Sequence, residues 1–279
     1  YLNKPLIMVC MDDFFINNRN KKEILGGIRQ KNFMRVVNKT AKDCDMIFTI
    51  CDEMNDAYGK LFEKKCLTLH TVAERKNVQL AQTARHVSYI GNLKCGRYKT
   101  LIDIGKALSE LRDENVPNVI DVYSGTREFD CIEPLKKAPG INFCGEISAE
   151  SVLEVMANSM AVIHTESFEQ EMMELVRFSV STKIAESLMY GPCLIAYGPE
   201  GIASIDYLKE NNAAYVISRP EDLEKGLEEI LTNKELREQI VRNARALALK
   251  NHNADVNPRK VRKWLQEVVD KSQNENSTN

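Results

Sequence analysis

Residues 181–196 have the sequence STKIAESLMYGPCLIA, and this stretch decides the fold class. It begins with two hydroxyl side chains and a lysine, and its apolar residues then recur with the spacing of a helix from about 182 to 190. Gly191-Pro192 ends that helix, and the apolar run 193–196 predicts a buried strand. A helix with a polar start, followed by a buried strand, is the repeating unit of a parallel sheet covered by helices.

The same alternation continues on both sides of this stretch. Further strands are predicted at 86–90, 119–123, 141–144, 161–164 and 214–217. Helices are predicted after most of these strands, and a long loop is predicted after 164. Ser148 is expected as one N-cap, Pro220 opens another helix, and a capping box runs from Thr232 to Glu235. Because helices alternate with strands that often end in glycine, the sequence predicts an α/β fold with a parallel sheet. Ligands bind such sheets beyond the carboxyl ends of the strands, which places the candidate site there.

The first 75 residues have too few strands for a complete doubly wound sheet. Only about three are predicted, where such a sheet commonly has five or six. We therefore expect a partial Rossmann-like domain and a complete one, joined by a polar connector at 71–85. The predicted division is 1–75 for the partial domain, 86–255 for the complete domain, 256–271 for a last helix and 272–279 for a disordered tail.

The composition excludes several classes of protein. The chain is 43% hydrophobic and 28% charged, with a net charge of −2, so it is neither disordered nor suited to nucleic acid. Its apolar runs are shorter than the roughly 20 residues that a membrane span needs. The eight cysteines form no C-x-x-C pair and favour buried free thiols in a reducing cytoplasm. No Cys/His cluster has zinc-ligand spacing, and the four histidines include no i,i+4 pair, so no metal site is expected.

Three loops at the predicted carboxyl edge favour a phosphate. Neither G-x-G-x-x-G nor a P-loop motif occurs, which removes support for redox dinucleotide and P-loop chemistry. The loop 91–99 carries three cations, the loop 177–183 leads with hydroxyls and Lys183 into a helix, and the loop 198–202 places Gly201 before another helix. Free N–H groups and the helix dipole attract an anion at such helix starts.

From Tyr89 to about His252 the chain resembles the C-terminal, donor-binding domain of GT-B nucleotide-sugar glycosyltransferases, most closely glycosyltransferase family 4. The runs YIGNL at 89–93, INFCGEI at 141–147 and the stretch 181–196 carry this resemblance. The most specific part is a glutamate separated by four residues from Gly-Pro and an apolar strand. The first 75 residues resemble the end of the acceptor-side domain, with Met11–Phe14 after its first strand and Ile50–Met54 near its close. The last helix resembles the one that crosses back to that domain.

The resemblance implies roles for individual residues. Arg97 would contact the donor diphosphate, Glu186 would accept hydrogen bonds from the ribose hydroxyls, and the backbone of Ile147 would meet the nucleobase. The predicted donor-binding residues are Asn92, Arg97, Ile147, Ser181, Thr182, Lys183, Glu186 and Gly201. Replacing Arg97 or Glu186 by alanine is expected to weaken nucleotide binding and leave the domain folded. The alternative for each residue is a structural one, such as a surface cation, a solvated helix residue or a core isoleucine.

Two positions depart from the family pattern. An arginine usually follows the first glycine, where this chain has Asn92, and a glutamate near the donor sugar usually stands at the position of Phe178. Four acids precede that position, and spacing does not choose a substitute among them: Glu166, Glu169, Glu171 and Glu174. The stretch Arg177-x-Ser-x-Ser-Thr-Lys183 resembles a subgroup of the family, so the departure is compatible with an active enzyme.

The resemblance implies transfer of a sugar from a nucleotide-diphosphate sugar to a glycan, polysaccharide or lipid-linked acceptor, with retention and without a metal or other cofactor. The expected location is cytoplasmic, including the inner face of the membrane. Two alternatives stay open: a non-catalytic GT-B subunit that binds nucleotide or a partner enzyme, and a nucleotide-sugar epimerase of the same fold. The basic cluster 259–263 leaves peripheral membrane contact open. By the same resemblance, the front of the acceptor-side domain is not among these 279 residues, so the chain is expected to be a fragment or to work with a partner that supplies that half. We then expect absent or very weak transfer by the isolated chain, and first 75 residues that are mobile, self-associate or pair with another chain.

Overall fold

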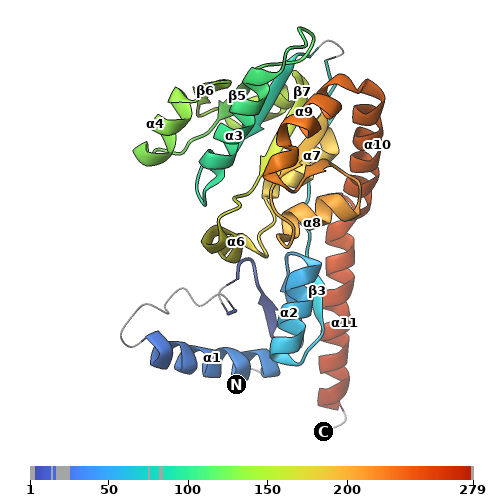
Figure 1. Ribbon diagram of the computed structural model, residues 1–279. Coiled ribbons are helices and arrows are strands. Elements are labelled where there is room, and N and C mark those ends of the chain that lie inside the picture. The colour runs from blue at the N-terminus through green and yellow to red at the C-terminus, as the bar shows by residue number, and fades with distance from the viewer. Residues whose placement is uncertain (1–3, 14, 17–25, 75, 82–83, 278–279) are drawn as a thin grey trace. The chain divides into compact units, whose positions relative to one another are not determined.

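The computed structural model describes residues 4–13, 15–16, 26–74, 76–81 and 84–277. These residues form two compact units (Figure 1). Unit 1 comprises Tyr1–Val72, Phe178–Val180 and Ala254–Asn279, and unit 2 comprises Ala73–Arg177 and Ser181–Asn253. The α/β fold predicted from the alternation of strands and helices is confirmed.

Unit 1 contains a three-stranded parallel sheet in the order β1-β2-β3. Its elements are β1 (Ile7–Val9), α1 (Gly26–Asp43), β2 (Met46–Thr49), α2 (Asp52–Phe62), β3 (Cys66–Thr68) and α11 (Asn257–Ser277). Aromatic side chains fill its core: the Tyr58 and Phe62 rings meet edge to face at 5.5 Å, and Trp264 of α11 lies 5.9 Å from Phe48 of β2. The packing of Trp264 explains why α11 belongs to this unit.

The C-terminal segment differs from the sequence prediction. A disordered tail was expected from Ser272, whereas α11 continues to Ser277, and residues 278–279 lie outside the described part. Phe14, which the resemblance placed after the first strand, also lies outside it. Leu6, Val9 and Met11, on and beside the edge strand β1, are exposed.

Unit 2 is built on a six-stranded sheet in the order β6-β5-β4-β7-β8-β9, with every neighbouring pair parallel. The strands are β4 (His86–Ile90), β5 (Ile120–Tyr123), β6 (Ile141–Gly145), β7 (Ser159–Thr165), β8 (Cys193–Tyr197) and β9 (Tyr215–Ile217). Counted along this unit, the order is 3-2-1-4-5-6, which is that of a Rossmann fold. Tyr89, Ile120, Val122, Ile163 and Ile195 lie in its buried core.

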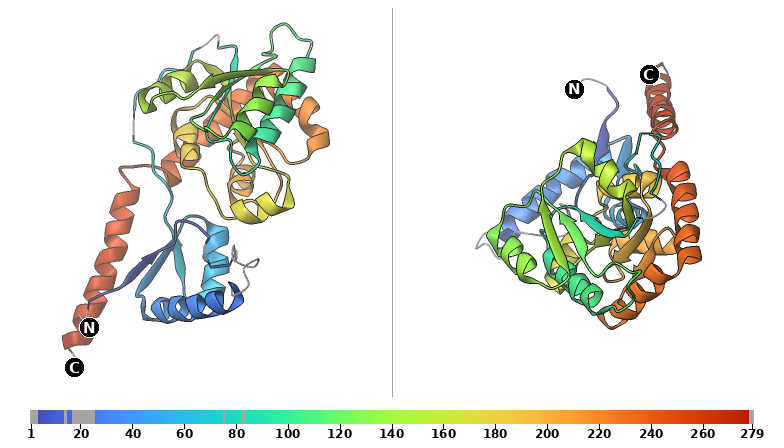
Figure 2. Two further views of the ribbon diagram at one scale, coloured as in Figure 1. Left: turned by 90° about the vertical axis from the view of Figure 1, so that its left-hand side faces the viewer. Right: turned by 90° about the horizontal axis from the view of Figure 1, so that it is seen from above.

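Helices cover both faces of this sheet (Figure 2). They are α3 (Arg97–Glu110), α4 (Phe129–Lys137), α5 (Ala149–Ala157), α6 (Gln170–Val176), α7 (Thr182–Tyr190), α8 (Ala203–Glu210), α9 (Leu223–Thr232) and α10 (Lys234–Asn251). Ser148 caps α5 as predicted, since its hydroxyl accepts the Ser151 N–H. The predicted cap of α10 was wrong by one residue, because Asn233 and not Thr232 accepts the Leu236 N–H. Pro220 opens a short 3₁₀ turn, Pro220–Asp222, ahead of α9.

One glycine pair sets the spacing between α3 and the turn before β6. Gly140 has a φ of +67°, and a Cβ built on it would lie 1.9 Å from the carbonyl oxygen of Gly105. A Cβ on Gly105 would in turn lie 2.7 Å from the carbonyl oxygen of Pro139. Backbone therefore packs directly on backbone here, and neither position has room for a side chain.

Candidate functional site

The topology of unit 2 fixes where a ligand would bind. From β4 the chain moves outward through β5 to β6, and from β7 it moves the other way to β8 and β9. The strand order therefore reverses between β4 and β7, and at such a point the loops at the carboxyl ends separate and leave a crevice. The loops that follow β4 and β7 contain Asn92, Arg97 and Glu166.

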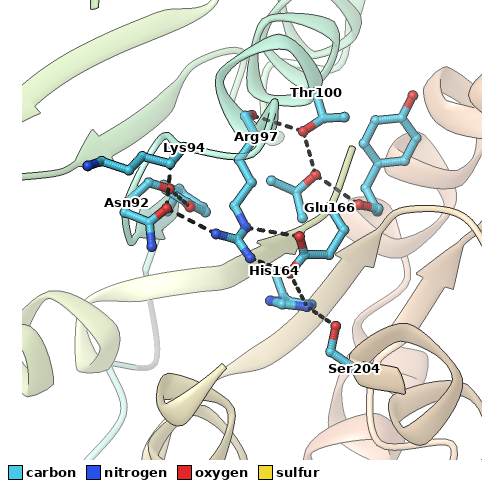
Figure 3. A network of polar contacts seen from close by, with 10 residues as sticks. Asn92, Lys94, Arg97, Thr100, His164, Glu166 and Ser204 are labelled. Atoms are coloured by element: carbon cyan, nitrogen blue, oxygen red, sulfur yellow. Dashed lines mark hydrogen bonds and ion pairs between the residues drawn. The ribbon is translucent and has the colours of Figure 1, made fainter. Parts of the chain in front are cut away.

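Arg97, the first residue of α3, is held by a buried carboxylate. Its Nε and NH2 groups donate to the two carboxylate oxygens of Glu166 at 3.0 and 2.7 Å, and its NH1 group donates to Asn92 Oδ1 at 3.0 Å (Figure 3). The Glu166 side chain is 1% exposed and that of Arg97 is 14% exposed. Two parallel charge-assisted bonds fix the plane of the guanidinium as well as its position.

The loop between β4 and α3 is fixed by further close contacts. The Tyr89 hydroxyl donates to the carbonyl oxygen of Asn92 at 2.6 Å, and the Leu93 N–H donates to Thr126 Oγ1 at 2.9 Å. Gly96 has a φ of +76°, and a Cβ there would lie 2.5 Å from Ser167 Oγ. Only glycine lets the start of α3 approach the loop after β7 this closely.

A buried histidine packs beside Glu166. His164 Nε2 lies 2.9 Å from Ser204 Oγ, on α8, and 3.8 Å from Glu166 Oε1 (Figure 3). Burial, together with the nearby charge of Arg97, lowers the pKa of His164 to about 3. The imidazole is therefore neutral at neutral pH. These polar side chains thus meet where the start of α3, the end of β7 and the start of α8 lie close together.

The charges of the Arg97–Glu166 pair depend on each other. Burial acts to lower the pKa of Arg97, but the Glu166 carboxylate outweighs it, so that this pKa is raised. Burial raises the pKa of Glu166, while the charge and hydrogen bonds of Arg97 act against that shift. The two parallel N–H···O bonds are the geometry typical of a guanidinium cation paired with a carboxylate anion.

The helix start predicted to bind phosphate is present in unit 2. Ser181 is the N-cap of α7, and its hydroxyl caps no N–H of the helix. Thr182 is exposed, and Lys183 and Glu186 are half-buried. A crossover helix runs antiparallel to the strands that it joins, so α7 starts at the carboxyl edge of the sheet. Its first N–H groups are oriented to receive an anion.

The remaining predicted residues lie in other loops of the same edge. Ile147, half-buried, follows β6, which is separated from β4 by β5. Gly201, with a φ of +85°, precedes α8, and its N–H already donates to Asp206 Oδ2 at 2.9 Å. The hydrogen bonds that join Asn92, Arg97 and Glu166 therefore include neither Ile147 nor Gly201.

Sequence reasoning missed the roles of Glu166 and His164. Glu166 was one of four candidate acids, and it is the buried one, whereas Glu169 is exposed and pairs with the exposed Lys99 at 2.5 Å. One feature of the sequence distinguishes Glu166 from the other three acids, since it directly follows the apolar run of the buried strand β7. Its partner lies 69 residues away in the sequence, and spacing could not identify it.

No helix in the described ranges has both the length and the apolar character needed to cross a membrane. Among the same residues, no three His, Cys, Asp or Glu side chains are grouped to hold a metal ion. A cavity of about 760 Å³ lies at the opposite edge of the sheet, where Ser159 and Cys193 begin β7 and β8, and Arg237 and Arg242 of α10 line it. None of the predicted site residues lines this cavity.

Comparison with known proteins agrees with this geometry. A family model described as glycosyl transferase-like matches residues 107–263, more than half of the chain. No curated protein matches the sequence. The fold is similar to that of a mutant of S. aureus TarM in complex with fondaparinux, alpha-GlcNAc-glycerol and UDP (TM-score 0.68, 14% identity, 95% of this chain, 50% of that chain). It is also similar to Anabaena Alr3699/HepE in complex with UDP, with a TM-score of 0.70, 12% identity, and coverage of 95% of this chain and 72% of that chain. A third similar structure is WaaG, a glycosyltransferase involved in lipopolysaccharide biosynthesis, with a TM-score of 0.59, 15% identity, and coverage of 88% of this chain and 71% of that chain. The chain thus spans half the length of TarM and under three quarters of the other two.

Proposed function

The chain belongs to the glycosyl transferase-like family, and from this premise we propose that it binds a nucleotide-diphosphate sugar and transfers the sugar to a glycan or lipid-linked acceptor. The predicted GT-B-like fold, with its complete Rossmann-like domain, is confirmed by the strand order and the structural matches. The proposal rests mainly on one observation, the fixed Arg97 guanidinium at the strand-order reversal of unit 2.

The chemistry of this edge suits a diphosphate leaving group. Arg97 and Lys183 are cations, and the first turn of α7 offers N–H groups that its N-cap side chain does not occupy. Preorganised donors of this kind stabilise the negative charge that develops on a leaving diphosphate. Glu186, one turn into α7, would accept hydrogen bonds from the ribose hydroxyls, as the resemblance implies. Uridine is the first base to test, because the HepE and TarM structures contain UDP.

We extend the proposal to retention at the anomeric carbon and to a polysaccharide or lipid-linked acceptor, by resemblance to glycosyltransferase family 4. The cysteines of the described part of the chain are all free thiols, which supports a reducing cytoplasmic location. Arg259, Lys260, Arg262 and Lys263 are exposed on α11, and their charges would favour the anionic inner face of a membrane.

Glu186→Ala is expected to weaken UDP binding by about tenfold or more, since a hydrogen bond to a charged group contributes about 1.5–3 kcal/mol. Binding is measured by calorimetry after a thermal-shift screen of UDP, GDP, ADP and their sugars. Glu228→Ala is the matched control, because Glu228 is an exposed helix glutamate of the same unit. Equal affinity of wild type and Glu186→Ala would remove Glu186 from the site.

Nucleotide binding is expected to be independent of divalent metal. The cations and helix N–H groups already offset the charge of the diphosphate. The affinity for UDP should therefore be the same in EDTA and in Mn²⁺. Loss of binding in EDTA with recovery in Mn²⁺ would contradict the proposal and indicate a metal-dependent glycosyltransferase class.

One observation favours a second candidate, a GT-B subunit that binds nucleotide without catalysing transfer. Phe178, at the position where relatives carry a glutamate near the donor sugar, is 3% exposed and has no ionisable group. Hydrolysis of a UDP-sugar by the purified chain, with and without candidate acceptors, separates the two candidates. Turnover supports the enzyme, and nucleotide binding without turnover supports the subunit.

A further inference from the structure

Burying the Arg97–Glu166 ion pair contributes little net free energy to the stability of the fold. Removing a carboxylate and a guanidinium from water costs several kcal/mol for each ion, and their attraction often does no more than offset that cost. Apolar side chains of similar size commonly serve stability as well. Glu166 is nevertheless 1% exposed and lies where the strand order reverses, so a role besides stability must be sought for it.

The geometry leaves part of Arg97 available. A guanidinium carries five N–H bonds. Among the described residues, Arg97 uses one on Nε and one on NH2 for Glu166, and one on NH1 for Asn92. Two N–H bonds remain, one on each terminal nitrogen, in a plane that Glu166 fixes. A phosphate oxygen at these two groups would meet a donor that needs no reorientation.

We infer that Glu166 is a positioning residue that holds Arg97 for the outer phosphate of the donor and thereby sets the preference of this site for a nucleoside diphosphate over a monophosphate. The inference rests on the proposed function. Arg97 starts α3, whereas the N–H groups of α7 start a different helix, so two anchors serve two phosphate groups. A monophosphate would use only one of them. His164, hydrogen-bonded to Ser204, packs beside the same carboxylate, with its Nε2 3.8 Å from Glu166 Oε1 (Figure 3).

Removing the charge of Glu166 tests this inference, because two explanations of diphosphate binding predict opposite changes in affinity. If long-range attraction governed diphosphate binding, removing the Glu166 charge would leave Arg97 unneutralised and strengthen binding. If the position of Arg97 governs it, the same change weakens binding, because a glutamine offers a single acceptor oxygen and its amide N–H groups oppose those of the guanidinium.

The test compares affinities of the full chain for UDP and UMP. Glu166→Gln is expected to lower the affinity for UDP by about tenfold and leave that for UMP unchanged, because a charge-assisted contact is lost only from the outer phosphate. A general loosening of the fold would lower both affinities alike. Asp222→Asn is the matched control, since it breaks an exposed arginine–carboxylate pair of the same unit, Arg219–Asp222.

Thermal melting establishes first that Glu166→Gln is folded. If it is not, Arg97→Lys decides the question, since it keeps the charge and loses the planar fork, and the same selective loss of UDP affinity is expected. An unchanged or increased preference for UDP in the deciding variant overturns the inference while leaving the proposed function standing. Failure of the wild type to bind any of UDP, GDP and ADP overturns the proposed function, and the inference with it.

Discussion

Arg97→Ala is expected to lower the free energy of unfolding of unit 2 by about 3–5 kcal/mol, the usual result of removing one partner from a buried ion pair. The Glu166 carboxylate, 1% exposed, would be left among buried groups with neither water nor a cation to compensate its charge. The sequence predicts instead that this substitution leaves the domain folded, because the resemblance gives Arg97 a role in ligand binding alone. Hydrogen exchange of the β7 and β8 amides measures the effect in unit 2 itself.

Two companion variants separate this explanation from a general loss of packing. Arg97→Met combined with Glu166→Leu removes both charges and is expected to recover most of the lost stability. Arg219→Ala, which breaks an exposed pair, should leave the stability of unit 2 close to that of wild type. A double variant as unstable as Arg97→Ala would show that the uncompensated charge is not the cause.

Acid is expected to destabilise unit 2 through His164. Its folded-state pKa is lowered to about 3 by burial and by Arg97, from an ordinary value of 6.5. Below pH 6.5 the unfolded chain binds a proton at His164, whereas the folded chain leaves the imidazole neutral until the pH approaches 3. The neutral buried imidazole therefore contributes to stability above pH 6.5, and this contribution is lost as the pH falls. The loss approaches about 1.4 kcal/mol per pH unit, or roughly 2–3 kcal/mol by about pH 4.5.

Urea denaturation followed by circular dichroism at about pH 7.5 and about pH 4.5 measures this loss. The difference between wild type and His164→Gln isolates the histidine from other groups that titrate over the same range. Glutamine keeps a hydrogen-bonding group near Ser204. The free energy of unfolding of His164→Gln should fall less between the two pH values than that of wild type. His86→Gln is the control, because the His86 side chain is 66% exposed. Equal pH dependence of wild type and His164→Gln would exclude a buried neutral imidazole.

The sheets could be predicted from the sequence because their strands are strongly apolar and end at glycine or polar residues. The six strands of unit 2 lie where the apolar runs predicted them. Two helices were missed for a physical reason. Helix α6 has seven residues and a single buried one, Val176, and α4 contains Pro134 and a largely exposed Phe129. Neither has an apolar face long enough to produce a helical period.

The site was less predictable than the sheets. Residue types at the strand end indicated the glycine-containing, cationic loop 91–99, and the resemblance to glycosyltransferase family 4 singled out Arg97 within it. The partner of Arg97 has none, since the Arg97–Glu166 pair is created by the adjacency of β4 and β7. A sequence shows that Glu166, Glu169, Glu171 and Glu174 are acidic, but only the packed sheet shows which of them is buried.

The contact between Gly105 and Gly140 has a consequence for evolutionary change in this unit. Because backbone touches backbone there, no side chain of residue 105 or 140 separates α3 from the turn before β6. A larger residue at either position would push apart this turn and α3, whose first residue is Arg97. In evolution, these two positions are therefore expected to change only together with a shift of the helix, so related chains that keep this packing should keep both glycines.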